Sequence, residues 1–429
     1  MQSDVETPAS PRPVPDFQVR DGFGPLHARV VAEIQAAIAD LKGPGAVGRL
    51  GGDLGQLHQV IEVGDVGALR DRVIEALRPD LLALAVRIGR ETLGWTHDFH
   101  VDDYLILRVN FPYEVARRAT APAENPGIGR VSPGVRAIAA SRRVKDPVYD
   151  PQGYHRDHPP PAWAHGPHLD SWAGHSHDGV NIWWAISDVP PQAGMVLYPQ
   201  MADTPLACDR RSLYLSAGHP LPPPTFAPLA AGEMLIFNPE VLHGTHLNVT
   251  DQTRVAVSLR LNAAQPTFDP ASFYAREFWR RASDIEAGAL DVVLHLKREE
   301  HFAPNAPPPV PPPSPRQDVR AWADGSALTI PLERPLREGE RLSVDAGHRR
   351  VLLARTATGL HATDANCPHY GLDLMDGGLD GDRLHCPGCA LGFDLGSGRS
   401  ACGDLRLKTY RVREGEDGVR VEIATAGEV

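Results

Sequence analysis

Four side chains that commonly bind metals lie close together in the C-terminal third of the sequence. Cys367 and His369 form a Cys-x-His pair, and Cys386 and Cys389 form a Cys-x-x-Cys pair after sixteen intervening residues. Thiolates and imidazoles are ligands for zinc and for iron–sulfur clusters, and two short ligand pairs on separate loops can hold one centre between them. The residues therefore predict a metal centre with three cysteines and one histidine.

Two kinds of metal centre suit this ligand set. Three thiolates and one imidazole can form a closed tetrahedral zinc site that only stabilises the fold. The stretch HATDANCPHYGLDLMDGGLDGDRLHCPGCALGFDLGSGR, however, resembles a Rieske domain. A Rieske [2Fe–2S] cluster has two cysteines on one iron and two histidines on the other. The resemblance implies a [2Fe–2S] cluster with Cys389 in place of the second histidine, and the added thiolate charge predicts a lowered reduction potential. A site without metal is the third alternative.

A second set of possible metal ligands lies in the middle of the chain. The phrase HGPHLDSW contains His168 and Asp170, and the phrase GEMLIFNPEVLHGTHLNVTDQTRVAVSLRL contains His243 and Arg254. Over roughly residues 95–265 the sequence resembles the phytanoyl-CoA-dioxygenase-like branch of the Fe(II)/2-oxoglutarate oxygenases. This resemblance implies that His168, Asp170 and His243 bind Fe(II) and that Arg254 binds 2-oxoglutarate.

The chemistry of such a site explains these residue types. Two imidazoles and one carboxylate on one face of Fe(II) leave three positions open, two for 2-oxoglutarate and one for dioxygen. The far carboxylate of 2-oxoglutarate is buried, and an arginine pairs with it through two parallel hydrogen bonds. Ser258, on the same expected strand as Arg254, is assigned to the same co-substrate. No catalytic residue is expected beyond the metal ligands, and Asp170 favours oxygenation, desaturation or cyclisation over halogenation.

The His-x-Asp pattern alone is weakly specific, because two other pairs occur, at residues 100–102 and 155–157. His168 is favoured because it follows the strand-like run YLILRV and precedes a strand-like run with paired tryptophans. It also lies five residues after Trp163, in a W-x-x-x-x-H-x-D setting like that of the family. For Arg254, the competitor is Arg260, whose spacing from the distal histidine fits less well.

Several residues are expected to surround the substrate. Trp172 follows the expected aspartate ligand by two residues and is expected to line the pocket. Arg108 and Asn110 lie on a strand expected to face the barrel interior and are predicted to contact substrate or co-substrate. Residues 111–165 show little periodicity, and their first part contains more basic than acidic residues. They are interpreted as a lid for an anionic group or, alternatively, as a surface insertion.

The hydrophobic patterns predict the elements that position these residues. Helical periodicity occurs at residues 24–43, 66–94 and 270–300. Strand-like runs lie between the second and third helical patterns, separated by proline and glycine turns; they span residues 104–111, 179–189, 194–199, 211–216, 233–239 and 253–261. The expected fold is mainly β with flanking helices. It combines a double-stranded β-helix (jelly-roll or cupin-like) oxygenase domain with a small all-β Rieske-like domain.

A proline-rich segment divides the chain. Residues 303–316 favour polyproline II, which acts as a semi-rigid spacer. The expected organisation is a flexible tail at residues 1–20, an oxygenase domain at 21–302, this linker, and a Rieske-like domain at 317–429.

Composition narrows the class of protein. A net charge of −11 argues against a nucleic-acid partner, and no apolar run approaches the length of a membrane span. The polar, proline-rich start lacks the apolar region of a secretory signal. Three of the five cysteines belong to the expected metal centre, which is unlike a disulfide framework. These features predict a cytoplasmic protein.

The expected activity is the oxidation of a small metabolite or natural product by Fe(II), 2-oxoglutarate and dioxygen. The fused domain could re-reduce the iron, reduce a substrate intermediate, or serve only for docking; a ferredoxin or reductase would donate the electrons. Two alternatives stay open. One is a Rieske-type mononuclear iron oxygenase that does not use 2-oxoglutarate, although its domain order would be reversed here. The other is a non-enzymatic barrel binding protein with a structural zinc module.

Overall fold

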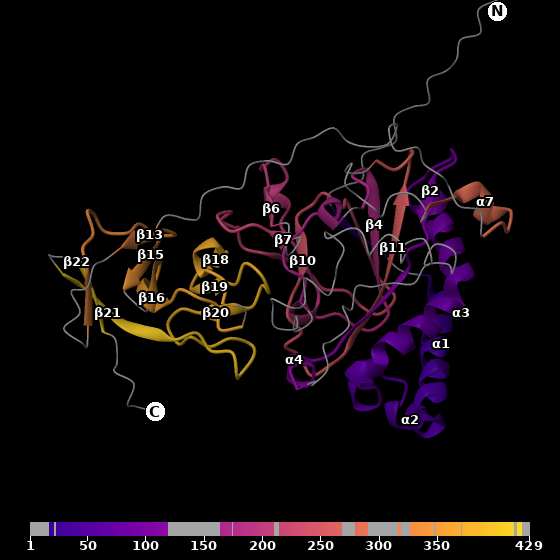
Figure 1. The fold of residues 1–429 in the computed structure, drawn as a ribbon, viewed down its shortest axis with the longest axis horizontal. Helices are drawn as coiled ribbons and strands as arrows, with labels where there is room; N and C mark the ends of the chain where they lie inside the picture. Colours follow the sequence, from indigo (N-terminus) through magenta and orange to yellow (C-terminus); the bar gives the residue numbers. More distant parts are fainter. Residues whose placement is uncertain are drawn as a thin grey trace, which may run out of the picture.

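The computed structural model describes most of the chain (Figure 1). The described residues are 17–20, 23–118, 164–173, 175–209, 214–267, 279–290, 316–318, 327–346, 349–369, 371–415 and 418–422. Most of the expected lid, Trp163, the His-x-Asp pair at 155–157 and nearly all of the expected linker therefore lie outside the described residues. Among the helices that the structure describes, none is long and apolar enough to cross a membrane.

Helices form the outer layer of the first domain. The two expected N-terminal helices are confirmed: α1 buries Val30, Ile34 and Ile38 at helical spacing, and α3 buries eleven residues along its length. Short helices connect or extend them. The bounds are α1 Gly24–Lys42, α2 Pro44–Leu50, η1 Leu54–Gln59, η2 Val63–Asp65, α3 Val66–Arg87, η3 Ile88–Thr92, α4 Tyr113–Ala116 and α7 Ala282–Glu286.

Two facing sheets form the core of this domain. The larger has the order β1-β9-β4-β11-β2-β12, with β3 also paired to β11, and the smaller has the order β10-β5-β8. Their strands are β1 Phe17–Arg20, β2 His100–Asp102, β3 Ile106–Asn110, β4 Gly179–Ala185, β5 Met195–Leu197, β8 Thr225–Ala227, β9 Met234–Phe237, β10 His243–Thr245, β11 Arg254–Asn262 and β12 Trp279–Arg281. A separate pair, β6 Cys208–Asp209 and β7 Tyr214–Leu215, lies beside them. This arrangement confirms the expected jelly-roll-type fold.

Alternation along the strands decides which residues can reach a site between the sheets. Trp184 and Val257 face outward and pack with α1 and α3, whereas Trp183 and Ala256 face inward toward the smaller sheet. Because side chains alternate with a period of two, every even position of β11 points inward. Arg254, Ser258 and Arg260 therefore share one face with the inward core.

The prediction of a helix at residues 270–300 is wrong for the middle of that range. Residues 279–281 form the strand β12, which pairs with β2, and only Ala282–Glu286 is helical in the described part of that range. Trp279 is almost fully buried in this strand. Tertiary pairing along a sheet edge thus overrides a local helical pattern.

The C-terminal domain is all β, as expected. One sheet has the order β13-β15-β16-β17-β21-β22-β14 and the other β18-β19-β20. The strands are β13 Arg316–Asp318, β14 Ala327–Ile330, β15 Arg341–Ala346, β16 Arg349–Thr356, β17 Gly359–Asp364, β18 Leu379–Asp380, β19 Arg383–His385, β20 Gly392–Asp394, β21 Thr409–Gly415 and β22 Gly418–Glu422. One loop with metal-binding residues joins β17 to β18, and the other joins β19 to β20. The smaller sheet faces the first domain (Figure 1).

Candidate metal centres

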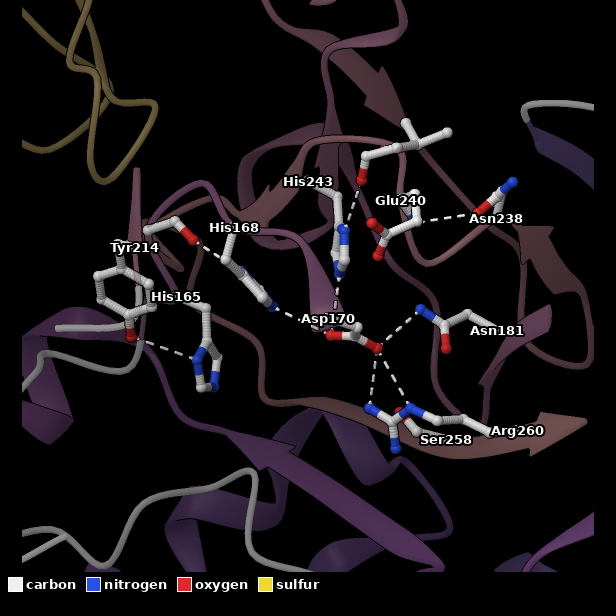
Figure 2. A network of polar contacts seen from close by, with 12 residues as sticks. His165, His168, Asp170, Asn181, Tyr214, Asn238, Glu240, His243, Ser258 and Arg260 are labelled. Carbon is white, nitrogen blue, oxygen red and sulfur yellow. Dashed lines mark hydrogen bonds and ion pairs between the residues drawn. The ribbon is translucent and has the colours of Figure 1, made fainter. Parts of the chain in front are cut away.

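Three side chains converge between the two sheets of the first domain (Figure 2). The Nε2 atoms of His168 and His243 lie 3.4 and 3.6 Å from the same Asp170 oxygen, Oδ1. Two backbone hydrogen bonds join the ligand segments: His168 N–H donates to His243 O at 2.8 Å and His243 N–H to His168 O at 3.0 Å. The strand β10 and the segment before η5 (Asp170–Ala173) thereby place both histidines beside the aspartate.

The histidine rings are held in the orientation that a metal requires. His168 Nδ1 lies 2.8 Å from Gly166 O, and His243 Nδ1 lies 2.8 Å from Val241 O. A carbonyl only accepts hydrogen bonds, so each Nδ1 carries the proton and each Nε2 presents a lone pair to the centre. With the carboxylate, this is a two-histidine, one-carboxylate donor set, which fits Fe(II) with open positions.

The other oxygen of the aspartate is fully engaged. Asp170 Oδ2 accepts hydrogen bonds from Asn181 Nδ2 at 2.9 Å and from Arg260 Nη2 and Nε at 3.1 and 3.2 Å. Burial alone would raise the pKa of Asp170, but the charge of Arg260 holds that pKa well below its usual range. Arg260 therefore keeps the ligand ionised, and it supports the carboxylate rather than the co-substrate.

Arg254 lies buried in the same interior. Its Nη1 donates to Ala193 O at 2.7 Å, and its guanidinium lies 5.4 Å from the centroid of the Trp183 ring. Within the described residues, no carboxylate forms an ion pair with Arg254. Burial, and then the positive charge of Arg108, lower the pKa of Arg254 to about 9. A buried guanidinium in this setting favours an anion, because a carboxylate would offset the cost of its desolvation.

The residues expected around this pocket have different placements. Arg108 Nε donates to Ser258 Oγ at 2.7 Å, so both side chains lie near Arg254. Asn110 is buried opposite Arg254 on the neighbouring strand. Trp172 instead packs against an apolar cluster that includes Tyr198.

The site also contains residues that the sequence pattern did not identify. The His165 ring lies 6.1 Å from the His168 ring, and its Nδ1 lies 3.4 Å from Tyr214 Oη. Burial, followed by the positive charge of Arg108, lowers the pKa of His165 well below its usual range, so the ring is neutral. His165 shares the phrase HGPH with His168, which was a usable signal, whereas nothing local points to Tyr214.

The competing His-x-Asp pair on β2 is not a ligand set. His100 Nδ1 lies 2.9 Å from Ala264 O, and Asp102 accepts a hydrogen bond from Tyr104 N–H at 2.9 Å. Burial raises the pKa of Asp102 to about 7. Among the described residues of the first domain, the one group of three or more possible ligand atoms that lie within 4.8 Å of one another is that of His168, Asp170 and His243.

The second centre lies in the C-terminal domain. The three Sγ atoms of Cys367, Cys386 and Cys389 lie within 4.8 Å of one another, and all three residues are buried. His369 is not part of this group; its ring packs edge-on against Tyr113, with centroids 5.3 Å apart. Burial raises the pKa of the Cys386 and Cys389 thiols well above the usual range. Only a bound cation would ionise such thiols, so the donor set fits a metal or a cluster.

Comparison with known proteins finds one matching family model in each domain. Residues 327–410 match the Rieske [2Fe–2S] domain model, and residues 130–256 match the phytanoyl-CoA dioxygenase (PhyH) model. The first range contains all four expected ligands of the C-terminal centre, and the second contains His168, Asp170, His243 and Arg254. The chain is therefore an oxidoreductase that joins a PhyH-type dioxygenase domain, which implies Fe(II) and 2-oxoglutarate, to a Rieske domain, which implies a [2Fe–2S] cluster.

Individual relatives match the C-terminal part. The ferredoxin component of a Pseudomonas aeruginosa naphthalene 1,2-dioxygenase system is 33% identical over 94 residues, which are 21% of this chain and 86% of that protein. Mouse (Mus musculus) apoptosis-inducing factor 3 is 33% identical over 101 residues, which are 24% of this chain and only 16% of that protein. Through its C-terminal domain, the chain belongs to the Rieske [2Fe–2S] family.

Solved structures match the same part. A complex of reduced oxygenase and oxidised ferredoxin in carbazole 1,9a-dioxygenase aligns with a TM-score of 0.21 and 26% identity. The alignment covers 22% of this chain and 99% of the matched chain.

Proposed function

We propose that this protein is an Fe(II)/2-oxoglutarate-dependent oxygenase that oxidises a C–H bond of a small metabolite or natural product. His168, Asp170 and His243 hold the iron, and Arg254 with Ser258 binds 2-oxoglutarate. The observation that carries the proposal is the pair of Nδ1 contacts to backbone carbonyls, which turns both Nε2 lone pairs toward one carboxylate oxygen. Bound Fe(II), with 2-oxoglutarate and dioxygen, supplies the oxidising power.

The chain's own residues prepare this site before any ligand binds. Arg260 and Asn181 occupy Asp170 Oδ2, so Oδ1 stays directed at the histidines. Arg254 presents its charge from the same inward face, stacked near Trp183. Both arginines and the aspartate are at least nine-tenths buried, which excludes water and strengthens each charge interaction.

The neutral His165 belongs to the same site. Its Nε2 is buried, and no hydrogen-bond partner for it lies among the described residues. Its ring centroid lies 6.1 Å from that of His168, and the charges of Arg108 and Arg254 add to burial in lowering its pKa. His165 is therefore placed to contact bound 2-oxoglutarate or substrate. Asp170 as a ligand supports oxygenation rather than halogenation, because it leaves no extra position for a halide.

The C-terminal domain is assigned a [2Fe–2S] cluster held by Cys367, His369, Cys386 and Cys389. The inward position of Cys389, with its Sγ beside the other two, supports the replacement of a histidine ligand. An anionic thiolate stabilises the oxidised cluster, so the reduction potential lies below that of a two-histidine cluster. A redox titration of the wild type against Cys389→His measures this difference, and equal potentials would remove Cys389 from the ligand set.

The activity is tested through co-substrate binding. Anaerobic protein with Fe(II) should develop the visible absorption of an Fe(II)–2-oxoglutarate complex and, with oxygen, release succinate. Arg254→Leu should raise the Kd for 2-oxoglutarate by roughly thirtyfold or more, because losing one partner of a buried charge pair costs about 2 kcal/mol or more. Arg254→Lys, which keeps the charge but not the planar fork, should fall between the two.

The control for this experiment is Arg87→Leu, at an exposed arginine that pairs with Glu91 on a helix surface. It should leave the Kd for 2-oxoglutarate unchanged. A wild-type protein that binds iron but neither binds 2-oxoglutarate nor forms succinate would contradict the proposal. That result would favour a Rieske-type oxygenase that works without this co-substrate.

A further inference from the structure

The C-terminal domain lies against the first domain on the side that carries β18, β19 and β20 (Figure 1). Leu247 N–H donates to Cys389 O at 3.1 Å, so a residue of the first domain is bonded to an expected cluster ligand. Asp376 also binds the first domain through two hydrogen bonds, both of 2.9 Å. Its backbone O accepts one from Leu221 N–H, and its Oδ2 accepts the other from Gly218 N–H. The contact surface is thus the end of the domain that carries the metal centre.

The contact with Cys389 leads directly to the iron site. His243 begins β10, and Leu247 follows it by four residues. An extended strand rises about 3.4 Å per residue, so this stretch spans no more than roughly 14 Å. One short run of backbone and one hydrogen bond therefore join an iron ligand to a cluster ligand.

Aromatic rings form a second connection through the same interface. The Phe226 ring lies 5.9 Å from the His385 ring and 5.8 Å from the His246 ring, measured between centroids. His385 directly precedes Cys386, and His246 follows the iron ligand His243 by three residues. His385 Nδ1 lies 3.1 Å from Ala390 O and His246 is buried, so both rings are fixed.

The packing of this interface resembles a protein core. Leu247 and Ala164 of the first domain belong to the same buried apolar cluster as the three cysteines. Ala390 in turn packs with Tyr198 and Leu242. At the rim, Arg117 pairs with Asp404, and Cys402 Sγ lies 3.6 Å from Glu114 Oε1. The expected lid thus begins with a helix, α4, that contacts the C-terminal domain.

We propose that this docked face is a built-in path by which the C-terminal domain passes one electron to the mononuclear iron of the same chain. The inference rests on the proposed function. One electron leaves the reduced cluster, which becomes oxidised, and a ferric mononuclear iron becomes ferrous. An external flavin- or ferredoxin-type reductase refills the cluster. Because the ligand loops are covered by the first domain, this reductase docks elsewhere on the C-terminal domain.

Gly378 offers a way to separate the domains without touching a ligand. A Cβ atom there would lie 2.4 Å from Pro222 O and 2.9 Å from Pro223 Cα, both backbone atoms of the first domain. Even alanine therefore cannot fit in the docked state. At Gly403, in the same domain, a Cβ atom would meet nothing within 4 Å, and Gly403→Ala is the matched control.

The test follows the cluster itself rather than turnover. Protein with an oxidised cluster and a ferric mononuclear site is mixed anaerobically with a fast one-electron reductant of the cluster. Stopped-flow absorbance then records the reduction and re-oxidation of the cluster, while electron paramagnetic resonance of freeze-quenched samples records the loss of ferric iron. The wild type and Gly403→Ala should show a rate independent of protein concentration. Gly378→Ala should slow this first-order phase by about an order of magnitude, because the tethered domain is no longer held at the iron site.

A second variant keeps the test valid if Gly378→Ala does not fold. Phe226→Leu keeps an apolar side chain at the interface but removes the ring between His385 and His246, and it should also slow the transfer. A wild-type rate proportional to protein concentration, or equal rates in all four proteins, would overturn the inference. The Fe(II)–2-oxoglutarate absorption is measured on the same samples. Its presence with a concentration-dependent rate rejects only the electron path, whereas its absence rejects the proposed function.

Discussion

Asp170 divides two tasks between its two oxygens. Oδ1 faces the histidines, whereas Oδ2 is held by Arg260 and Asn181. The sequence resemblance identified the aspartate but treated Arg260 only as a weaker candidate for the co-substrate. Its contact with Asp170 could not be read from spacing, because both arginines occupy inward positions of β11, and only the pairing of β11 with β4 places Arg260 beside this aspartate.

Replacing Arg260 should weaken iron binding without removing a ligand. In Arg260→Met the Asp170 carboxylate loses its main charge partner, and the affinity for Fe(II) should fall about 10- to 100-fold, as is typical when a ligand's hydrogen-bond partner is lost. The pKa of Asp170 should also rise toward its usual range or above it. A depressed carboxyl pKa favours the ionised form until the pH falls through it, so the variant should release iron at a higher pH than the wild type.

Competition titrations with a metal-binding dye across pH measure both effects. Arg72→Met is the control, since Arg72 pairs with Asp40 on the exposed side of the helices. An Arg260→Met protein with the iron affinity and pH profile of the wild type would show that Arg260 does not stabilise the ligand.

At the scale of elements, the strands that position the site were largely predictable. The runs at residues 179–189, 233–239 and 253–261 became β4, β9 and β11, because alternating or continuous apolar residues mark strands locally. The strand β10 has only three residues and no periodicity, although it carries His243. Its position depends on long-range contacts with the segment around His165, which no local pattern encodes.

That close contact predicts a sensitive glycine. A Cβ at Gly244 would lie 2.7 Å from His165 O, so Gly244→Ala should push β10 away from the segment that carries His168. We expect a marked loss of Fe(II) affinity and a lower melting temperature, even though no ligand is changed. Gly48→Ala in α2 is the comparison, because its new methyl group would meet nothing within 4 Å.

Alanine should stabilise that helix by up to about 1 kcal/mol, since glycine is the poorer helix former. Metal titration and thermal unfolding of both variants distinguish the two cases. Unchanged iron binding in Gly244→Ala would mean that β10 tolerates the displacement.

For the whole molecule, the order of the two domains and their types followed from motifs, but their contact did not. The motifs for Cys367 and His168 each point to a centre within its own domain. The hydrogen bond from Leu247 to Cys389 joins backbone atoms that are far apart in the sequence, so neither residue type predicts it. The same holds for the start of the expected lid. The sequence shows that Arg117 is basic, but it does not show that its ion-pair partner is Asp404 of the other domain.

The two-domain assignment predicts a definite metal content. Anaerobically purified protein should contain about three irons and about two acid-labile sulfides per chain, one iron for the His168 site and a [2Fe–2S] cluster for the cysteines. Cys386→Ser should lose the sulfide and about two irons while keeping the mononuclear iron. About one zinc per chain and no sulfide would instead make the C-terminal domain a structural module.

The link between Leu247 and Cys389 consists of main-chain atoms only. Substituting either side chain leaves the N–H and the C=O in place, and among the standard residues only proline at position 247 would remove the donor. The two domains can therefore accumulate substitutions on both sides of the interface without losing this bond. Such a connection depends on the path of the backbone and not on the identity of either residue.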